Sequence, residues 1–259
     1  TASLWLCTAP GRMGTVALAL SLLVMALVCP ASASLRVGAF NIQAFGDSKM
    51  SNVEVAGIIV RILSRYDVVL VQEVRDSDLS AVTQLMEQLN RYERGWGWKG
   101  SDPQDVFSRE PFILRVSAPH SKAEQFVLVP LHSAPHDAVA EIDALYDVYL
   151  AIVSKWGTDN IMFLGDFNAD CAYVQPSDWP AIRLRSSELF KWLLPDSSDT
   201  TVGKSDCAYD RIVVCGSKLR RSVVPSSAAI YNFQRAFQLE QDEALAVSDH
   251  YPVEVKLMA

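Results

Sequence analysis

The sequence predicts a layered α/β domain, and three observations support that prediction. From Leu35 onward, short apolar runs typical of strands alternate with longer runs that repeat at helical spacing. Nearly every strand-like run begins or ends at a carboxylate, amide or imidazole side chain, as in layered folds that build a site at one edge of their sheets. The 259 residues, 50% of them hydrophobic and 20% charged, suffice for one large core. One domain over residues 34–259 is therefore expected.

The first half of this domain is expected to contain two strands and two helices. Residues 35–42 and 67–74 are nearly continuous apolar runs, as expected for buried strands. Between them, residues 52–66 show apolar side chains at helical spacing. A second helix is expected over 77–90, because this run opens on a Ser-Asp pair that can cap its first turn.

The second half repeats the alternation. A strand is expected over 124–133, followed by a long helix over 137–157 that a glycine closes. Three further strands are expected over 160–170, 209–216 and 248–257. We see no internal repeat, linker or low-complexity segment, so one domain remains the economical interpretation.

Residues 1–33 are expected to lie outside the fold. An apolar run over 16–28 begins soon after Met13, and the small residues 31–33 follow it, which is typical of a secretory signal cleaved after residue 33. A membrane anchor is the alternative, but the run is short for a bilayer. Residues before Met13 read as upstream translated sequence. We therefore expect an exported protein that begins near Ser34 and has no stable membrane association.

Three of the five cysteines lie beyond this leader, at Cys171, Cys207 and Cys215. In an oxidising compartment, an odd number allows one disulfide and one free thiol within a monomer. Cys215 lies in an apolar run and is expected to be a small buried hydrophobe. The expected disulfide is therefore Cys171–Cys207, and no CxxC or Cys/His cluster indicates zinc.

The formal net charge of −7 bears on possible partners. An acidic protein is not steered toward polyanions by its overall field. If the chain handles nucleic acid, it needs a local basic patch or bound cations to do so.

The polar residues at the strand ends form a consistent chemical set. They are Asn41, Glu73, His132, Asp166, Asn168, Asp210, Asp249 and His250. Carboxylate and amide oxygens without thiolates suit a hard cation such as Mg²⁺ or Ca²⁺. Two histidines can divide general base and general acid roles. Metal-assisted hydrolysis of a phosphoester is the reaction that uses all of these groups.

Each of these residues also has a purely structural interpretation. Asp166 and Asn168 could form a turn after a strand, and Asp249 could cap another turn. A lone histidine is more often structural than catalytic, and we place His120 and His136 in that class. Taken together at successive strand ends, however, the set favours a site over coincidence.

Several motifs carry a more specific signal. The chain contains "AFNIQAFGDSKMS", "YDVVLVQEVRDSDLSAV", "FLGDFNADCAYV", "SDCAYDRIVV" and "SDHYPVEV". From Leu35 to about Leu257, it resembles the deoxyribonuclease I family of secreted endonucleases. The resemblance implies a four-layered α/β sandwich of two packed, mostly antiparallel sheets flanked by helices. It also implies DNA as the partner and a monomer that uses Mg²⁺ and Ca²⁺.

The resemblance implies roles residue by residue. His250 with Asp210 matches the pair that activates the attacking water, and His132 matches the second catalytic histidine, on the leaving-group side. The residues that match ligands of the divalent metal and the scissile phosphate are Asn41, Glu73, Asp166, Asn168 and Asp249. Those that match contacts to the DNA backbone and minor groove are Arg75, Arg109 and Tyr173. A few basic side chains near the site, together with bound metal, would supply the positive charge that an acidic protein needs to contact DNA phosphates.

Structural features are implied as well. Asp199 and Thr201 match a structural calcium loop, in which Gly203 replaces a usual hydroxyl residue. The residues that match most of a second calcium site are Asp105, Phe107 and Glu110. Cys171 and Cys207 match the essential disulfide of the family.

The chain departs from the family at "LNRYERGWGWKGSDPQ", residues 89–104. The family carries a longer segment here, with a DNA-contacting loop, two strands and a glutamate that partners the histidine matched by His132. Two strands and their connections need roughly 20 to 40 residues, and this stretch is too short. We therefore expect one sheet to lack strands, central ones in particular, and His132 to lack its orienting carboxylate. The tryptophans could form a stacking platform for bases, but a junction is the favoured interpretation.

Three functions follow as alternatives. The leading one is a secreted, metal-dependent DNA endonuclease with little sequence specificity. The second is a catalytically inactive or unstable variant that acts at most as a binder. The third is another phosphoesterase with the same fold, since fold alone does not choose the substrate.

Overall fold

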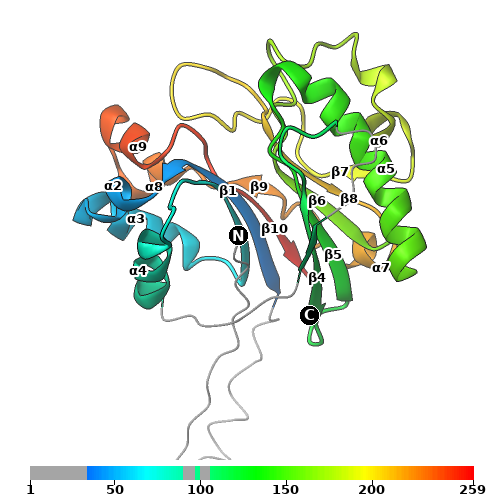
Figure 1. The fold of residues 1–259 in the computed structure, drawn as a ribbon, viewed down its shortest axis with the longest axis horizontal. Coiled ribbons are helices and arrows are strands. Elements are labelled where there is room, and N and C mark those ends of the chain that lie inside the picture. The colour runs from blue at the N-terminus through cyan, green and yellow to red at the C-terminus, as the bar shows by residue number, and fades with distance from the viewer. Residues whose placement is uncertain (1–33, 90–96, 100–105) are drawn as a thin grey trace, which may run out of the picture.

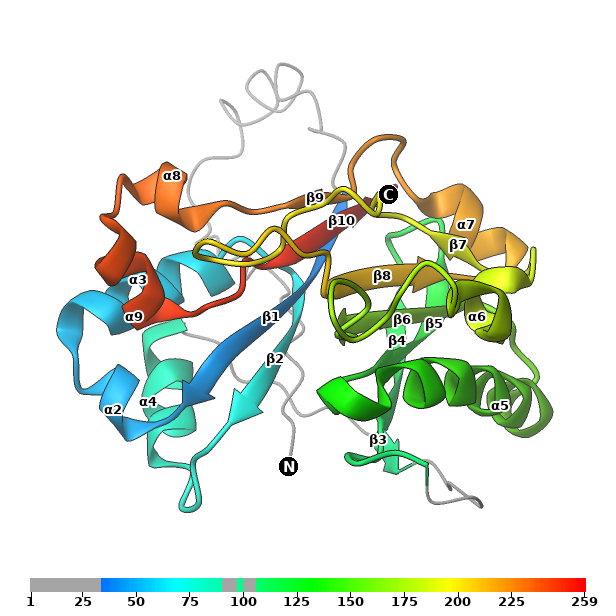
Figure 2. The same cartoon turned by 90° about the horizontal axis from the view of Figure 1, so that it is seen from above.

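The computed structural model describes residues 34–89, 97–99 and 106–259, and for 97–99 only the backbone is considered (Figure 1). The expected signal segment, residues 1–33, lies outside the described part. Two β-sheets face each other, and helices cover the outer face of each (Figures 1 and 2). The expected four-layered sandwich is confirmed.

The first sheet has the strand order β2-β1-β10-β9. Strand β1 (Leu35–Phe45) pairs parallel with β2 (Val68–Val74) and antiparallel with β10 (Val253–Leu257), and β9 (Ala229–Ile230) closes the far edge. The helices that accompany this sheet are α2 (Asp47–Met50), α3 (Val53–Leu63), α4 (Ser80–Leu89), α8 (Phe233–Phe237) and α9 (Gln241–Val247).

The second sheet has the order β3-β4-β5-β6-β8-β7. Its strands are β3 (Gly97–Lys99), β4 (Phe112–Ala118), β5 (Glu124–Pro130), β6 (Ile161–Asp166), β7 (Lys191–Trp192) and β8 (Asp210–Val214). Among the pairings that the described residues make in this sheet, β5 with β6 is parallel and the others are antiparallel. The helical segments on this side are the 3₁₀ turns Pro135–Asp137 and Trp179–Ala181, and helices α5 (Ala138–Trp156), α6 (Arg183–Ser186) and α7 (Ser217–Ser222).

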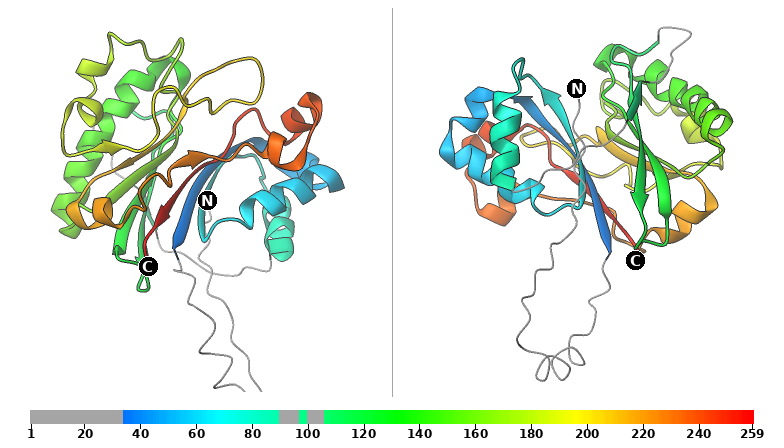
Figure 3. Two further views of the ribbon diagram at one scale, coloured as in Figure 1. Left: turned by 180° about the vertical axis from the view of Figure 1, so that it is seen from behind. Right: turned by 60° about the horizontal axis from the view of Figure 1, so that its bottom comes forward.

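Three apolar clusters hold the layers together, and Figure 3 shows the layers from two further sides. One cluster fills the space between the sheets and joins residues such as Val37 and Val255 to Leu128 and Leu164. A second packs the first sheet against α3, α4 and α9, and a third packs the second sheet against α5. Burial of both faces of a sheet explains why several strands read as nearly continuous apolar runs.

Helix boundaries follow local chemistry. Helix α3 begins where the Asn52 side chain accepts hydrogen bonds from the Glu54 and Val55 amides. The expected long helix ends at Gly157, whose left-handed backbone (φ 63°) satisfies a terminal carbonyl. For α4, Asp78 accepts from the Ser80 amide as expected, but the other acceptor is Asp76 and not Ser77.

The described strand of the shortened segment, residues 97–99, lies at the edge of the second sheet. Our expectation that central strands are missing is wrong, because β4, β5, β6 and β8 form an unbroken centre. The tryptophan-glycine stretch also contributes a short strand, β3, which pairs only with residues 112–114 of β4. Among the described residues, 115–118 have no strand partner on that side. An edge location explains how the sheet tolerates a short segment.

The described residues contain no helix long and apolar enough to cross a membrane.

Candidate active site

Six elements of both sheets deliver polar side chains to one edge of the sandwich. Asn41 lies on β1 and Glu73 on β2, in the first sheet. Asp166 ends β6 and Asp210 begins β8, in the second sheet. His132 follows β5, and Asp249 with His250 precedes β10. The structure thus brings together residues that are up to about two hundred positions apart, as the strand-end pattern predicts.

His250 and Asp210 form the tightest pair in the cluster. His250 Nδ1 lies 2.7 Å from Asp210 Oδ2, and both residues are buried. Burial alone lowers the pKa of His250, but the Asp210 carboxylate outweighs it and raises that pKa to about 10. The Thr200 hydroxyl accepts from the Asp210 amide at 3.1 Å and so holds the start of β8. The imidazole is therefore oriented through Nδ1, with Nε2 left toward the cluster.

Asp166 lies at the centre of the cluster. Its Oδ2 is 3.7 Å from His250 Nε2 and 3.7 Å from His132 Nε2, and it accepts from Asn41 Nδ2 at 3.2 Å. Burial, reinforced by the Asp210 carboxylate, raises the pKa of Asp166 to about 6. A positive partner beside Asp166 would therefore stabilise its ionised form.

Glu73 reaches the cluster through an unusual backbone. Its φ is 59°, and the pairing of β1 with β2 shifts register between Asn41 and Phe45. Burial alone would raise its pKa, but hydrogen bonds from Asn41 (3.3 Å) and from the Ala44 amide (3.1 Å) keep the pKa below its ordinary value. The left-handed backbone at a bulky residue is strain of the kind that accumulates at functional sites.

Two further predicted ligands have different settings. Asp249 accepts from Gln43 Nε2 at 2.9 Å, and its Oδ1 lies 4.0 Å from His250 Nε2. Asn168, by contrast, is buried and donates to the Ser133 carbonyl at 3.0 Å. Asp249 therefore borders the cluster, whereas Asn168 also ties the loop after β6 to the loop after β5.

His132 differs from His250 in its charge. Its Nε2 lies 3.8 Å from Glu73 Oε1, and Arg109 donates to its backbone carbonyl at 3.2 Å. Burial and the Arg109 guanidinium lower the pKa of His132 to about 4. Among the described residues, no carboxylate contacts its Nδ1. At neutral pH this imidazole is uncharged.

The cluster suits a divalent cation. Ligand atoms of Asp166, Asp210 and His250 lie within 4.8 Å of one another. Asp210 Oδ1 is buried without a hydrogen-bond partner among the described residues, which is costly unless a donor or a cation satisfies it. Glu73 adds a third carboxylate. Buried oxygens with excess negative charge are what Mg²⁺ or Ca²⁺ binds.

The predicted DNA-contacting residues surround the cluster. The Arg75 side chain is 73% exposed and lies 3.7 Å from Glu73, and Arg109 is exposed as well. Tyr173 lies 5.4 Å from the Tyr209 ring, which in turn lies 6.3 Å from the His250 ring, measured between centroids. A row of rings therefore leads from the His250–Asp210 pair toward the surface.

The structure describes both named residues of the first predicted calcium site but only part of the second. In the first, Thr201 Oγ1 lies 2.7 Å from both Asp199 Oδ1 and the Ser205 carbonyl oxygen. One hydroxyl proton can serve only one of these acceptors at a time. In the second, Phe107 is buried and Glu110 half-buried, but Asp105 lies outside the described residues.

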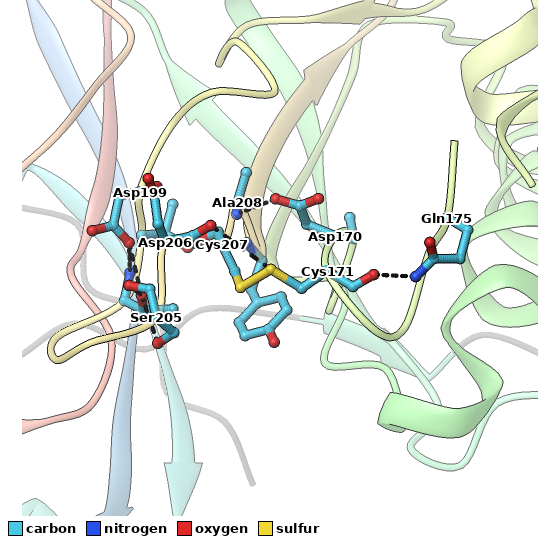
Figure 4. Close-up of a disulfide and its surroundings, with 12 residues drawn as sticks. Asp170, Cys171, Gln175, Asp199, Ser205, Asp206, Cys207 and Ala208 are labelled. Carbon is cyan, nitrogen blue, oxygen red and sulfur yellow. Dashed lines mark hydrogen bonds between the residues drawn. A yellow bond between two sulfur atoms is a disulfide. The ribbon is translucent and has the colours of Figure 1, made fainter. Parts of the chain in front are cut away.

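The predicted disulfide joins Cys171 to Cys207, with Cα atoms 5.8 Å apart (Figure 4). Asp170 beside it accepts from the Ala208 amide at 2.8 Å. The bond connects the loop after β6 to the loop before β8, so it lies behind both Asp166 and Asp210. Cys215 is buried, as expected, and the structure leaves it free.

Sequence reasoning missed several residues that shape the site. Thr200 holds Asp210, Tyr209 stands between Tyr173 and His250, and Gln72 bridges the two sheets. A signal for Gln72 existed. Val68, Leu70 and Gln72 alternate along β2, so a polar residue stands where the pattern requires an inward apolar one.

Comparisons with known proteins agree with this fold and cluster. The chain matches the Endonuclease/Exonuclease/phosphatase family over residues 38–250. Deoxyribonuclease-1-like 2 of Mus musculus is 54% identical, covering 90% of this chain and 95% of that relative. Deoxyribonuclease-1 of Gallus gallus is 48% identical, covering 93% and 99%.

The alignments also show a difference in length between this chain and a relative. Deoxyribonuclease-1-like 2 of Homo sapiens aligns at 53% identity over 283 residues, although the match covers 90% of this 259-residue chain and 95% of the relative. That relative therefore contains residues that have no counterpart here.

Solved structures show the same fold at low identity. Humanized TDP2 of D. rerio has a TM-score of 0.60 at 15% identity and covers 87% of this chain and 99% of its own. A mannosyl-6-phosphatase of Bacteroides thetaiotaomicron has a TM-score of 0.53 at 15% identity, with 87% and 100% covered. From its sequence match and its architecture, the chain belongs to the endonuclease/exonuclease/phosphatase family.

Proposed function

We propose that this chain is a secreted, divalent-metal-dependent endodeoxyribonuclease that hydrolyses DNA phosphodiester bonds with little sequence specificity. The observation that carries the proposal is the His250–Asp210 pair, which directs Nε2 toward the cluster of Asp166, Glu73 and Asn41. The relatives named deoxyribonucleases support DNA as the substrate class. Exposed Arg75 and Arg109 provide local positive charge on an acidic protein.

The pair can act as a general base. A cation beside Asp166 and Asp210 would counter the negative charge that keeps His250 protonated in the metal-free protein and so favour its neutral form. In that form His250 Nε2 takes a proton from a water molecule, while Asp210 stabilises the imidazolium that forms. The water oxygen then bonds to phosphorus, and the bond from phosphorus to the leaving oxygen breaks. Glu73 and Asp166, with Asn41, Asn168 and Asp249, would hold the metal and the scissile phosphate. A cation held there would stabilise the charge that develops on the phosphoryl oxygens.

His132 is proposed as the general acid on the leaving-group side. Its lowered pKa means that it carries a proton near neutral pH only when additional negative charge lies beside it. A bound phosphate supplies such charge, but the described residues offer no carboxylate at Nδ1. We therefore expect a smaller contribution from His132 than from His250.

The lack of a carboxylate at His132 Nδ1 among the described residues supports the second candidate function, a catalytically impaired variant that still binds DNA. The family resemblance places the partner glutamate in the segment that is short here, and the aligned human relative is longer. The calcium loop at Asp199 and Thr201 and the disulfide would then stabilise the fold. Export, a monomeric state and the absence of stable membrane association belong to the same proposal, and a disulfide is typical of exported proteins.

A plasmid-nicking assay separates the candidates. Supercoiled DNA is incubated with the protein at several Mg²⁺ concentrations, with and without Ca²⁺, beside His250→Ala. An inositol phosphate and a sphingomyelin substrate are tested in parallel. Metal-dependent nicking that His250→Ala abolishes supports the nuclease. DNA binding without nicking supports the impaired variant. Hydrolysis of the other substrates alone, seen as phosphate released from the inositol phosphate or phosphocholine released from sphingomyelin, would refute both.

A further inference from the structure

Gln72 forms a polar bridge between the two sheets directly behind the cluster. It lies on β2 of the first sheet, is 7% exposed, and faces the second sheet. Its Nε2 donates to the Leu131 carbonyl at 2.7 Å, and its Oε1 accepts from the Asp166 amide at 2.9 Å. Both ends of one amide are thus satisfied by backbone groups, one in β6 and one in the loop that follows β5.

The position of this bridge matters because of its neighbours in the chain. Gln72 precedes Glu73, Leu131 precedes His132, and Asp166 itself belongs to the cluster. His132 lies 3.8 Å from Glu73 and 3.7 Å from Asp166. Apolar contacts between the sheets are non-directional and allow small shifts, whereas two hydrogen bonds define a separation.

At Gly165, the backbone of β6 lies very close to the Gln72 side chain and to the Leu131 carbonyl. Its φ is 125°, and a Cβ there would lie 2.5 Å from the Leu131 oxygen and 2.7 Å from Gln72 Nε2. Any side chain at this position would push the amide away or displace the strand. The bridge therefore depends on the glycine in "FLGD" as well as on Gln72.

The chemistry of the bridge selects glutamine. The side chain must donate at one end and accept at the other without adding charge. Glutamate would place an acceptor against the Leu131 carbonyl and a negative charge beside Asp166. Methionine would fill the space but leave a buried amide and a buried carbonyl unpaired.

We propose that Gln72 is a positioning residue: its amide sets the separation between Glu73 and Asp166 and thereby the affinity of the site for a divalent cation. The proposal rests on the function proposed above, in which these two carboxylates hold the metal. Gln72 itself contacts neither metal nor substrate. Its effect acts through the backbone of β6 and of the loop that carries His132.

The test measures Mg²⁺ binding directly. The metal-free full chain and its Gln72→Met variant are titrated with Mg²⁺ by calorimetry, and kcat and KM for plasmid DNA are measured at saturating Mg²⁺. The control is Val255→Ala, which removes buried volume from the same inter-sheet core in the middle of β10. Thermal unfolding of all proteins shows that the control is destabilised to a comparable degree.

We expect Gln72→Met to weaken Mg²⁺ binding at least tenfold, with KM for DNA changed less than threefold, while Val255→Ala binds Mg²⁺ like the unaltered protein. If Gln72→Met does not fold, Gln72→Asn, which keeps a neutral amide but is one methylene too short to reach both backbone groups, is measured instead with the same expectation. Binding within twofold of the unaltered protein would overturn the inference, and so would an equal loss in the control. If the unaltered protein binds Mg²⁺ but cleaves no DNA, the proposed function fails while the binding constants still decide the role of Gln72. If it binds no Mg²⁺, both are overturned.

Discussion

Replacement of Cys171 and Cys207 by serine should mainly lower stability and leave the folded site intact. The bond closes a loop with a sequence separation of 36. In the chain-entropy treatment, opening a loop of this length costs about 4 kcal/mol of unfolding free energy at 25 °C. For a domain of this size, that corresponds to a drop in Tm of roughly 8–16 °C.

The site should persist because other contacts hold the same two loops. Asp170 accepts from the Ala208 amide at 2.8 Å. The buried Arg211 side chain donates to the Ala208 carbonyl at 2.7 Å and to the Ala169 carbonyl at 3.2 Å. At temperatures well below the new Tm, the nicking rate of the double variant should therefore stay within about threefold of the unaltered protein, since these bonds remain.

Urea unfolding followed by circular dichroism measures the free-energy change, and plasmid nicking at 15 °C and 37 °C measures the activity. Cys215→Ala is the matched control, because Cys215 is free and buried, and its replacement breaks no disulfide and only weak hydrogen bonds from Sγ to the Asp159 and Ile161 carbonyls. A stability loss below about 1 kcal/mol would contradict the loop-entropy reasoning. Loss of activity at 15 °C in a fully folded variant would contradict the claim that the remaining contacts position the site.

Three further predictions follow from the geometry. Asp210→Asn should lower the nicking rate by about 10²–10⁴-fold, because His250 loses the carboxylate that orients it and raises its pKa; a rate within threefold would refute the assignment of the base pair. In the metal-free protein, the pKa of Asp166 is raised, so its protonated form favours the folded state. This contribution to stability is complete below pH 3.8 and is lost as the pH rises through about 6. Mg²⁺ should therefore bind more tightly as the pH rises, and its binding should release protons. Calorimetry in buffers of different ionisation enthalpy checks this, and a pH-independent affinity would contradict it. Gly157→Ala should cost about 1 kcal/mol in urea unfolding without affecting nicking, since a Cβ there has free space and only the left-handed backbone is strained; an unchanged urea midpoint would count against the cap.

Much of the fold was predictable because its signals are local. The long helix that ends at Gly157 and the buried strands expected over 67–74 and 160–170 follow from apolar periodicity and caps, although the second strand ends earlier, at Asp166. Strand β4 was missed although Val116 and Ala118 are buried and Arg115 and Ser117 are exposed. Strand β3 could not be found from periodicity, because three residues are too few for a repeat to show. It exists through its pairing with β4.

The candidate site likewise has features that local sequence predicts and features that it does not. The residue types and their places at strand ends predict a hard-cation site with two histidines, since those are properties of each short segment. The charges of the two histidines could not be predicted, because they depend on partners distant in sequence. Asp210, 40 residues away, raises the pKa of His250, whereas burial and Arg109 lower that of His132.

The sequence by itself determined the α/β class, the chemistry of the cluster, the disulfide partners and the departure from the family at residues 89–104. Only the tertiary structure decided that this departure falls at a sheet edge, and that Gln72 joins the sheets behind the cluster. The physical reason is that strand order and inter-sheet contacts arise from packing of segments far apart in the chain. No local pattern of side chains encodes which strand becomes the edge or which buried amide meets which backbone.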